Sequence, residues 1–428
     1  MNFCHMKMPS KQKVGEIFLA AAICVFAFFF RMWFITLEPQ PFAYDQNEYE
    51  HYAYKIITAP FMLASHSYRS YPYPFLEAVI YKFTFWSDHQ AIYTVNAVLD
   101  SLVAVFVFLL LRFGFKRKSI AWIGYFLYAV NPFTSGYVGV GLSEILATFF
   151  IMGTLVVGLW FVKKPGKFVG LLFGLFAGMA AETRNAAFAW AGVPIVLSFF
   201  WVDRKRQKWA YGAIVFGLFL TTVYPLYTNW RDFHEINITK VDSFYAMEFF
   251  NGASLKILPP FTYTYPVEQN QMWYEYWSEQ WPGRTTEQRK VIADKYWKKG
   301  WDIVWANPVD YIRWRFFKMW YVWQKENVFF YKESGFAEHK QYIYLYNLTL
   351  LILGMIGMVF GWKQTKNTRG KWILASFVGT ILYGTLAFSI SHAEYRLSIP
   401  FYPVIIALSA IGIGVVWSVV EKYVWAKH

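Results

Sequence analysis

The sequence predicts an all-α integral membrane protein with about ten transmembrane helices. Hydrophobic residues make up 57% of the 428 residues and charged residues only 16%, below the roughly 25% that is usual in soluble globular proteins. Apolar stretches long enough to cross roughly 30 Å of hydrocarbon recur along the chain. Aromatic residues reach 22%, as expected of a chain with many membrane–water interfaces to anchor.

The predicted spans divide the chain into three regions. Residues 1–228 form an N-terminal transmembrane bundle of seven spans with one sizeable outer loop, residues 38–89. Residues 229–342 form a long outer segment between spans seven and eight, and residues 343–428 add three spans. The ten spans are expected near residues 15–37, 90–111, 119–135, 142–162, 168–182, 186–202, 209–228, 343–362, 372–390 and 397–420.

The first outer loop contains two predicted interfacial helices. The first covers residues 45–58 and begins at Asp45, a residue type that caps helix N-termini well. The second begins at Tyr71-Pro-Tyr-Pro and continues to about residue 86. It is too short to span the bilayer comfortably, so we expect it to lie in the interface or to enter the membrane part way.

The long outer segment carries two helix-start patterns. Thr285 followed by Gln288 resembles a capping box. Asn307 followed by Pro308 combines a cap with a first-turn proline and predicts a helix over Val309–Lys325. This second helix mixes aromatic and basic side chains, as helices that lie on a membrane surface do.

The net charge of +14 is distributed unevenly across the predicted loops. With the N-terminus in the cytoplasm, one side collects 20 basic and three acidic residues, whereas the remainder holds 21 basic and 24 acidic residues. Short cytoplasmic loops rich in Lys and Arg are the positive-inside pattern of membrane proteins. The excess therefore indicates topology, with both termini cytoplasmic, and removes the main argument for a nucleic-acid partner.

Two further features concern the compartment. Cys4 and Cys24 fall in the predicted cytoplasmic tail and the first span, which excludes an external disulfide framework. The first apolar segment is too long for a signal-peptide core and lacks a small-residue cleavage site, so we expect it to be retained as a span. We expect a multi-pass protein of a bacterial or archaeal cell membrane whose active site faces outside.

Ionisable residues gather at the predicted outer ends of separate hairpins. They are Asp45, Glu48, Glu144, Glu182, Arg184, His392, Glu394 and Arg396. Ionisable groups near membrane depth are expensive and are functional candidates by default. Acids and two arginines that converge at one rim indicate a site for an anionic substrate at the interface.

Each of these candidates also has a structural interpretation. Asp45 could serve only as a helix cap, and Glu144 could cap span four or pair with Arg184. Arg184 and Arg396 could simply extend to lipid headgroups. Both interpretations stay open at the level of the sequence.

Other polar residues favour structural roles. Arg31 and Asp100 lie inside predicted spans near the outer side, where such residues are more often structural partners than ligands. His51, His66 and His89 are too scattered for a metal motif.

Several short motifs follow one another along residues 15–415. They are Asp45 with Tyr49 and Ala53, Tyr71-Pro-Tyr-Pro-Phe-Leu, Gly141-Leu-Ser-Glu-Ile-Leu, Gly174 to Thr183-Arg184, Asn307-Pro-Val-Asp-Tyr-Ile-Arg, and Glu394-Tyr-Arg-Leu-Ser-Ile-Pro-Phe-Tyr-Pro. The ordered set resembles the C-class membrane glycosyltransferases, specifically the family-thirty-nine group of protein mannosyltransferases and bacterial aminoarabinose transferases. The first motif corresponds to the group's Asp-Glu-x-x-Tyr-x-x-x-Ala.

The chain departs from that group at two points. Gln46 replaces the second acid of the usual Asp-Glu pair, and Glu48 follows two residues later. This departure argues against a pair of acids that contacts a metal or the acceptor. No large soluble domain follows the last span, unlike in the protein-glycosylating oligosaccharyl enzymes.

The resemblance implies transfer of a hexosyl or pentosyl group, with inversion, from a polyprenyl- or dolichyl-phosphate donor to a lipid, glycan or protein acceptor. It implies Asp45 as the general base, since a carboxylate can take the acceptor proton as the bond forms. Fixed cations would stabilise the charge that gathers on the departing phosphate. The residues expected to bind substrate are Glu48, Tyr49, Glu144, Arg184, Glu394 and Arg396.

Among these residues, Arg184 and Arg396 are the expected phosphate ligands. Glu144 would orient hydroxyl groups of the acceptor or the sugar, and Glu48 would support Asp45. No metal-ligand spacing stands out, so no metal residues are assigned, although a divalent metal is compatible with this chemistry.

Two other functions remain open. A polytopic lipid or sugar transporter would be expected to show internal repeats and polar residues near the midplane, and the sequence shows neither. A non-catalytic membrane assembly protein of the same fold would be expected to lose the base, whereas Asp45 is retained.

Overall fold

The computed structural model describes residues 11–58, 70–84, 89–115, 117–202, 207–234, 236, 238, 242–258, 262–264, 286–391 and 394–424. Within these ranges the chain is almost entirely helical, and the regular β structure described is one antiparallel pair, β1 (Lys256–Leu258) and β2 (Thr262–Thr264), in which Ile257 is opposite Tyr263. The predicted helical membrane fold is therefore confirmed in its class.

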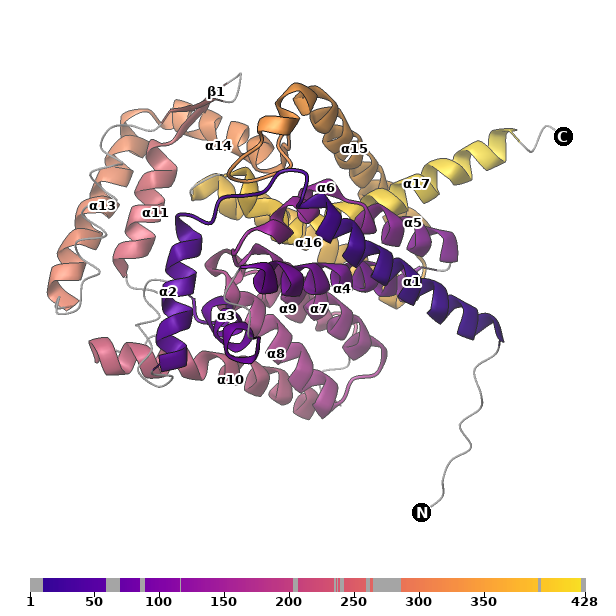
Figure 1. The fold of residues 1–428 in the computed structure, drawn as a ribbon, viewed down its shortest axis with the longest axis horizontal. Helices are drawn as coiled ribbons and strands as arrows, with labels where there is room; N and C mark the ends of the chain where they lie inside the picture. The colour runs from indigo at the N-terminus through magenta and orange to yellow at the C-terminus, as the bar shows by residue number, and fades with distance from the viewer. Residues whose placement is uncertain are drawn as a thin grey trace, which may run out of the picture.

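Seven of the described helices are long and apolar enough to cross a membrane. They are α1 (Lys11–Phe34), α4 (Gln90–Gly114), α7 (Glu144–Lys163), α10 (Lys208–Phe233), α15 (Lys340–Gln364), α16 (Thr368–Ile390) and α17 (Tyr402–Val424), the last preceded directly by the 3₁₀ helix η4 (Tyr395–Phe401). These helices lie side by side in the body of the molecule (Figure 1).

The other three predicted spans take shorter forms. The span near 119–135 is interrupted and consists of α5 (Lys118–Ala129), α6 (Pro132–Ser135) and η1 (Gly136–Gly139). The span near 168–182 is α8 (Lys167–Thr183), a helix of 17 residues, and the span near 186–202 is η2 (Asn185–Ala187) followed by α9 (Gly192–Ser198). The count of ten crossings stays a prediction.

The break after α5 has a local cause. Pro132 lacks an amide proton and restricts the residue before it, so the helix ends ahead of it. Asn131 then caps the next helix, since its side chain accepts a hydrogen bond from the Thr134 amide at 3.2 Å. The sequence restarts as a second helix at the point where the first one ends.

The predicted outer-loop helices are present as α2 (Asp45–Thr58) and α3 (Pro72–Phe83). The long outer segment contains α11 (Asp242–Ser254), α13 (Thr286–Ala306) and α14 (Pro308–Trp323), of which α11 had no predicted counterpart. The expected capping residue Thr285 lies outside the described residues. A short 3₁₀ helix, η3 (Ser334–His339), leads into α15.

Glycines allow two helix pairs to approach closely. A side chain on Gly174 or Gly217 would collide with backbone atoms of the facing helix in the α8–α10 pair, and the same holds for Gly357 and Gly412 in the α15–α17 pair. Small residues at helix–helix contacts are characteristic of membrane bundles, where close backbone packing replaces the hydrophobic effect.

The buried pair predicted inside the spans has a structural role. Arg31 is 0% exposed, and its Nε lies 2.6 Å from Asp100 Oδ2. Its Nη1 donates to the carbonyls of Ala27 and Ala129, each at 3.0 Å, and its Nη2 donates to the Tyr128 carbonyl at 3.4 Å. Tyr128 donates to the second oxygen of Asp100 at 2.5 Å. The pair therefore joins α1, α4 and α5, as an internal charge must be fully partnered to be tolerated.

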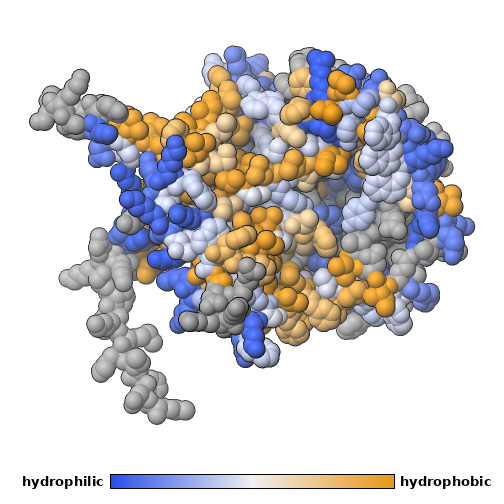
Figure 2. Space-filling view, turned by 180° about the vertical axis from the view of Figure 1, so that it is seen from behind, coloured by the Kyte–Doolittle hydropathy of each residue, from blue (hydrophilic) through white to orange (hydrophobic). Residues whose placement is uncertain are grey.

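The surface agrees with this arrangement. Figure 2 shows hydrophobic residues across the middle of the molecule and hydrophilic ones gathered toward its two ends. In Figure 1 the start of α1 and the end of α17 lie on one side, and α2, α11 and α13 lie on the opposite side.

Candidate active site

Asp45 lies at the start of α2, on the side of the molecule away from the start of α1 (Figure 1). Tyr44, directly before it, has a φ of 54°, a left-handed conformation that is uncommon for a residue with a side chain. The ring of Tyr44 stacks on Tyr331 at 5.8 Å. Backbone strain of this kind concentrates at functional sites, and here it turns the chain sharply so that the helix begins at Asp45.

The approach to Asp45 is fixed to the loop that follows α14. Gln40 accepts from the amides of Tyr331 and Lys332 at 2.8 and 3.1 Å and donates to the Lys332 carbonyl at 2.8 Å. Glu38 accepts from the Gly335 amide at 2.7 Å and lies 3.0 Å from the Lys332 ammonium. Two segments nearly 300 residues apart in sequence are thereby held together beside the site.

Asp45, Glu394 and Arg396 form one charged cluster. A terminal nitrogen of Arg396 donates to Asp45 Oδ2 at 3.2 Å, and its Nε contacts the Glu394 carboxylate. All three side chains are between 21% and 28% exposed, so a ligand can reach them. The guanidinium also lies 4.9 Å from the centre of the Phe330 ring, a cation–π distance that fixes its plane.

Glu144 and Arg184 form a second pair beside the first. Glu144 begins α7, and its carboxylate lies 2.7 Å from Arg184, which follows α8. The Glu144 side chain is 3% exposed and that of Arg184 is 14% exposed. The charge of Glu144 also acts on Arg396, and α7 packs against η4, so the two pairs are neighbours. The structural interpretation of Glu144 as the partner of Arg184 is therefore correct for the unliganded protein.

The remaining predicted residues occupy supporting positions. Tyr49, buried on α2, donates to the Ser143 hydroxyl at 3.3 Å and packs edge-on against Tyr73, with ring centres 5.1 Å apart. Glu48 is half-buried one turn after Asp45, and Glu182 is buried at the end of α8. His392, predicted at the same rim, lies outside the described residues.

Gln46 has a role that the resemblance did not suggest. Its side chain is fully buried; the carbonyl accepts from the Gly141 amide at 2.6 Å, and the amide donates to the Pro41 and Ala43 carbonyls at 2.9 and 3.3 Å. An acid could not make both kinds of bond while ionised. The residue in the second position of the Asp-Glu motif therefore ties the first outer loop to the turn before α7.

Glu77 is a buried acid that sequence reasoning did not single out. It lies on α3 within the Tyr-Pro-Tyr-Pro helix, is 0% exposed, and neither carboxylate oxygen has a hydrogen-bond partner. Burial raises the pKa of the Glu77 carboxyl well above its usual 4.5, and the charge of Glu50 adds to this. The only signal of Glu77 in the sequence was an acid on the otherwise apolar face of a short helix.

The described residues contain no group of three or more His, Cys, Asp or Glu side chains that could hold a metal ion. Of the histidines considered above, His89 lies 2.9 Å from Glu50 and stacks on Phe42, while His66 lies outside the described residues. The arrangement offers cations and carboxylates at one exposed rim, which suits binding of an anion next to a base.

No protein-family model matches the sequence, and no curated protein is significantly similar to it. Solved structures do share its fold. The apo crystal structure of an Archaeoglobus fulgidus oligosaccharyltransferase is similar with a TM-score of 0.51 and 14% identity, over 95% of this chain and 52% of that one. The archaeal oligosaccharyltransferase AglB from the same organism, with an inhibitory peptide and a dolichol-phosphate, gives a TM-score of 0.48 and 15% identity, over 96% of this chain and 52% of that one.

The chain thus spans about half the length of these solved oligosaccharyltransferases. At this level of identity the likeness concerns the fold. The protein has a helical fold, with helices long and apolar enough to cross a membrane, that it shares with an Archaeoglobus fulgidus oligosaccharyltransferase.

Proposed function

We propose that the protein is a glycosyltransferase that moves a sugar, with inversion, from a polyprenyl- or dolichyl-phosphate donor to an acceptor at the outer membrane face. The observation that carries this proposal is the pairing of two arginines with three acids at one exposed rim of a fold shared with an oligosaccharyltransferase. A phosphate borne on a lipid must lie at such a rim, because its tail stays in the membrane.

The donor phosphate would bind Arg396, with Arg184 as the second cation. A guanidinium can hold a phosphate through two parallel hydrogen bonds. In the unliganded protein Asp45 and Glu394 neutralise Arg396. A phosphate would therefore compete with the Asp45 carboxylate for the same guanidinium.

This competition gives Asp45 its role. When the phosphate engages Arg396, the Asp45 carboxylate no longer shares that guanidinium and can accept the proton of the acceptor nucleophile as the glycosidic bond forms. The leaving phosphate gathers negative charge beside the arginines, which are already in place and need little reorganisation. Glu144 and Glu48 would orient hydroxyl groups and support Asp45.

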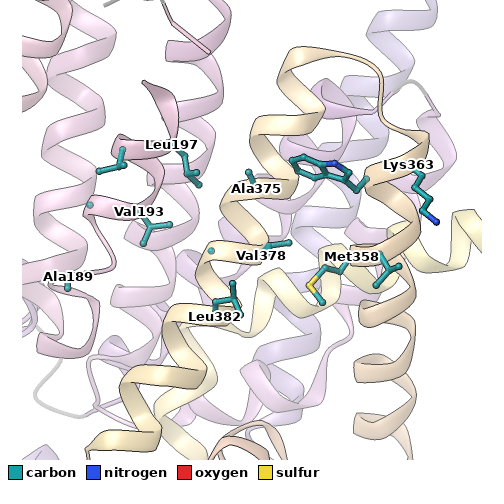
Figure 3. A pocket seen from close by; sticks show the side chains of 13 residues that line it. Ala189, Val193, Leu197, Met358, Lys363, Ala375, Val378 and Leu382 are labelled. Atoms are coloured by element: carbon teal, nitrogen blue, oxygen red, sulfur yellow. The ribbon is translucent and has the colours of Figure 1, made fainter. Parts of the chain in front are cut away.

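An apolar groove supports a lipid-borne donor. It lies between α9 on one side and α15 and α16 on the other, with a volume of about 870 Å³ (Figure 3). Val193 and Leu197 face it from α9, and Val378 and Leu382 face it from α16. Its lining includes Ala189, five residues after Arg184 in the sequence, and an apolar groove of this kind could hold the tail of a lipid-borne donor.

The family group and the sugar carried by the donor are also part of the proposal. The resemblance of the motifs favours the family-thirty-nine group and a hexosyl or pentosyl donor. The transfer assay described below identifies the acceptor class and any need for a divalent metal. A transporter or a non-catalytic assembly protein with this fold would bind the lipid and form no product.

The test is incubation of the purified protein with polyprenyl-phosphate sugars and candidate lipid, glycan and peptide acceptors, with and without EDTA. Mass spectrometry should show an acceptor heavier by one sugar residue and free polyprenyl phosphate in equal amount. Donor binding without product, across hexosyl and pentosyl donors and all acceptor classes, would contradict the proposal.

A further inference from the structure

The segment that leads to Arg396, residues 391–394, joins the end of α16 to the start of η4, and α14 packs against both of these elements. Glu394 ends the segment, and Arg396 is the second residue of η4. Residues 392 and 393 of the segment lie outside the described residues. The contacts are made by buried cations of α14 and of the residues just after it, which no part of the proposed chemistry uses.

Before the segment, Arg315 holds the end of α16. Arg315 is 7% exposed, and one terminal nitrogen donates to the Ser389 and Ile390 carbonyls at 2.6 and 3.1 Å. The other donates to the Gly252 carbonyl of α11 at 2.5 Å. The last carbonyls of a helix have no partner within it, so Arg315 satisfies groups that would otherwise be buried and unpaired.

After the segment, Lys325 holds the start of η4. Lys325 lies two residues after the end of α14, beyond the C-cap residue Gln324, and is 1% exposed. Its ammonium donates to the Val322 carbonyl at 2.9 Å, the Tyr395 carbonyl at 2.5 Å and the Ser398 hydroxyl at 2.6 Å. Ser398 in turn donates to the Val322 carbonyl at 2.5 Å. Tyr395 and Ser398 bracket Arg396 within a single turn of η4.

The partner set shows what holds η4 in place. Two of the three groups around the Lys325 nitrogen are carbonyls, which can only accept, so Lys325 donates to both. The third is the Ser398 hydroxyl, which itself lies within hydrogen-bond distance of the Val322 and Tyr395 carbonyls. Burial lowers the pKa of Lys325 well below its usual 10.5, but the two bonds to carbonyls form in either protonation state, so this one side chain ties the turn that presents Arg396 to the end of α14.

We propose that Lys325 is the positioning residue for the donor-binding arginine, and that α14 sets the location of Arg396 relative to Asp45. The inference rests on the proposed function of Arg396 as phosphate ligand. Lys325 itself bonds only backbone and Ser398, and it would act on donor binding entirely through η4.

The test is Lys325→Met, which keeps the length and apolar stem and removes the three donors. Because small displacements of a positioned group can cost about 10²-fold, we expect the KM for the lipid-phosphate donor to rise about 10- to 100-fold. The KM for the acceptor should change by less than about threefold. A rise of the same size in the KM for the donor and in the KM for the acceptor would show a general structural role for Lys325 and would overturn the proposal.

Lys318→Met is the matched control. Lys318 is a second lysine of α14, is 0% exposed, and donates to the Gly252 carbonyl of α11. Its loss removes a buried ammonium from the same helix without touching η4. We expect reduced thermal stability comparable to that of Lys325→Met and a donor KM close to that of the unsubstituted protein.

A double-mutant cycle with Arg396→Lys separates positioning from direct action. If Lys325 acts through Arg396, Lys325→Met should have little further effect on donor KM once Arg396 is replaced, because interacting sites are non-additive. If the two substitutions instead raise the donor KM additively, the inference is overturned. Should Lys325→Met fail to fold, Ser398→Ala replaces it, with a smaller rise in donor KM expected.

The inference and the proposed function fail in different ways. Absence of transfer by the unsubstituted protein would end the proposed function. Normal transfer in which Lys325→Met and Ser398→Ala leave the donor KM unchanged would end only the positioning role.

Discussion

At the rim of the bundle, two arginines are shared among three carboxylates, and this balance has a chemical consequence. Arg396 contacts Asp45 and Glu394, and Arg184 contacts Glu144. The acids outnumber the arginines, so an anion that binds Arg396 must compete with the Asp45 and Glu394 carboxylates for it. Under the proposed function, this competition would couple donor binding to the interactions of Asp45.

Asp45→Asn tests the base. Asparagine keeps the size and helix-capping ability of the residue but cannot take a proton, so turnover should fall about 10²- to 10⁴-fold with folding preserved. Single-turnover transfer with saturating donor measures this directly. Glu48→Gln is the control one helical turn away, with a smaller loss expected. Near-normal turnover of Asp45→Asn would move the base to Glu48 or Glu144.

Arg396→Lys tests the phosphate ligand. Lysine keeps the charge but offers no planar pair of donors. If Arg396 binds the donor phosphate, the variant should insert and fold normally yet bind donor more weakly and transfer more slowly. If Arg396 only extends to lipid headgroups, lysine should serve equally well. Donor affinity by titration with fluorescent polyprenyl phosphate distinguishes the two, and an unchanged affinity returns Arg396 to a structural role.

Glu77 predicts a pH dependence of stability. Because its pKa is raised in the folded protein, the stability it contributes is complete below about pH 4.5 and is lost as pH rises toward the folded-state pKa. Glu77→Gln resembles the protonated acid, so as the pH rises above about 4.5 the thermal midpoint of this variant should fall less than that of the unsubstituted protein. Glu338→Gln, on the exposed η3, should leave the profile unchanged. Parallel profiles for all three proteins would show that Glu77 is ionised.

The sequence could identify the charged residues at the rim because an acid or arginine beside an apolar span is conspicuous in composition. It could not show which ones pair, since Asp45 and Arg396 are 351 residues apart in the chain and meet only through tertiary packing. Gln46 was interpreted as a lost acid, although its amide satisfies a donor and two acceptors that an acid could not. Its importance depends on the neighbours, which the sequence alone does not display.

At the scale of elements, helices bounded by clear signals were predicted well, and interrupted ones were not. The α2 helix begins at Asp45 and α14 at Pro308, as the capping patterns indicated. The stretch near 119–135 reads as one apolar span because hydropathy averages across Asn131-Pro132. Backbone geometry at that proline, and not hydrophobicity, decides that the helix ends.

Gly217→Ala tests the close contact of α8 with α10. An added methyl group at Gly217 would lie 2.5 Å from the Leu171 carbonyl oxygen and 2.8 Å from the Leu175 nitrogen, so the helices must separate. We expect a loss of about 1–3 kcal/mol in stability, typical of overpacking, seen as a lower thermal midpoint in detergent. Gly212→Ala is the control on the same helix, where an added methyl group meets nothing within 4 Å. Equal midpoints for both variants would show that α8 and α10 do not pack this way.

At the scale of the whole molecule, the seven long helices do not by themselves account for the topology. The start of α1 and the end of α17 lie on the same side (Figure 1), and an odd number of crossings would place them on opposite sides. Counting α5 with η1, α8, and η2 with α9 as three further crossings gives an even number and returns both ends to one side. The charge distribution favours the same solution, because 20 of the basic residues then face the cytoplasm.

Single cysteines in a background without Cys4 and Cys24 test this topology. Cysteines at Lys164, Lys208 and Lys366 should be labelled by an impermeant maleimide only from the cytoplasmic side, and those at Asn47 and Glu287 only from outside. Asn185→Cys is decisive for the short elements: if α8 and α9 cross the membrane, it reports the outer side although Lys164 and Lys208 on either side of it report the cytoplasm. Labelling of all three from one side would mean that α8 and α9 form a re-entrant pair. In that case Arg184 could not share a rim with Arg396, and the pairing of Arg184 with Glu144 would have to be abandoned along with the site.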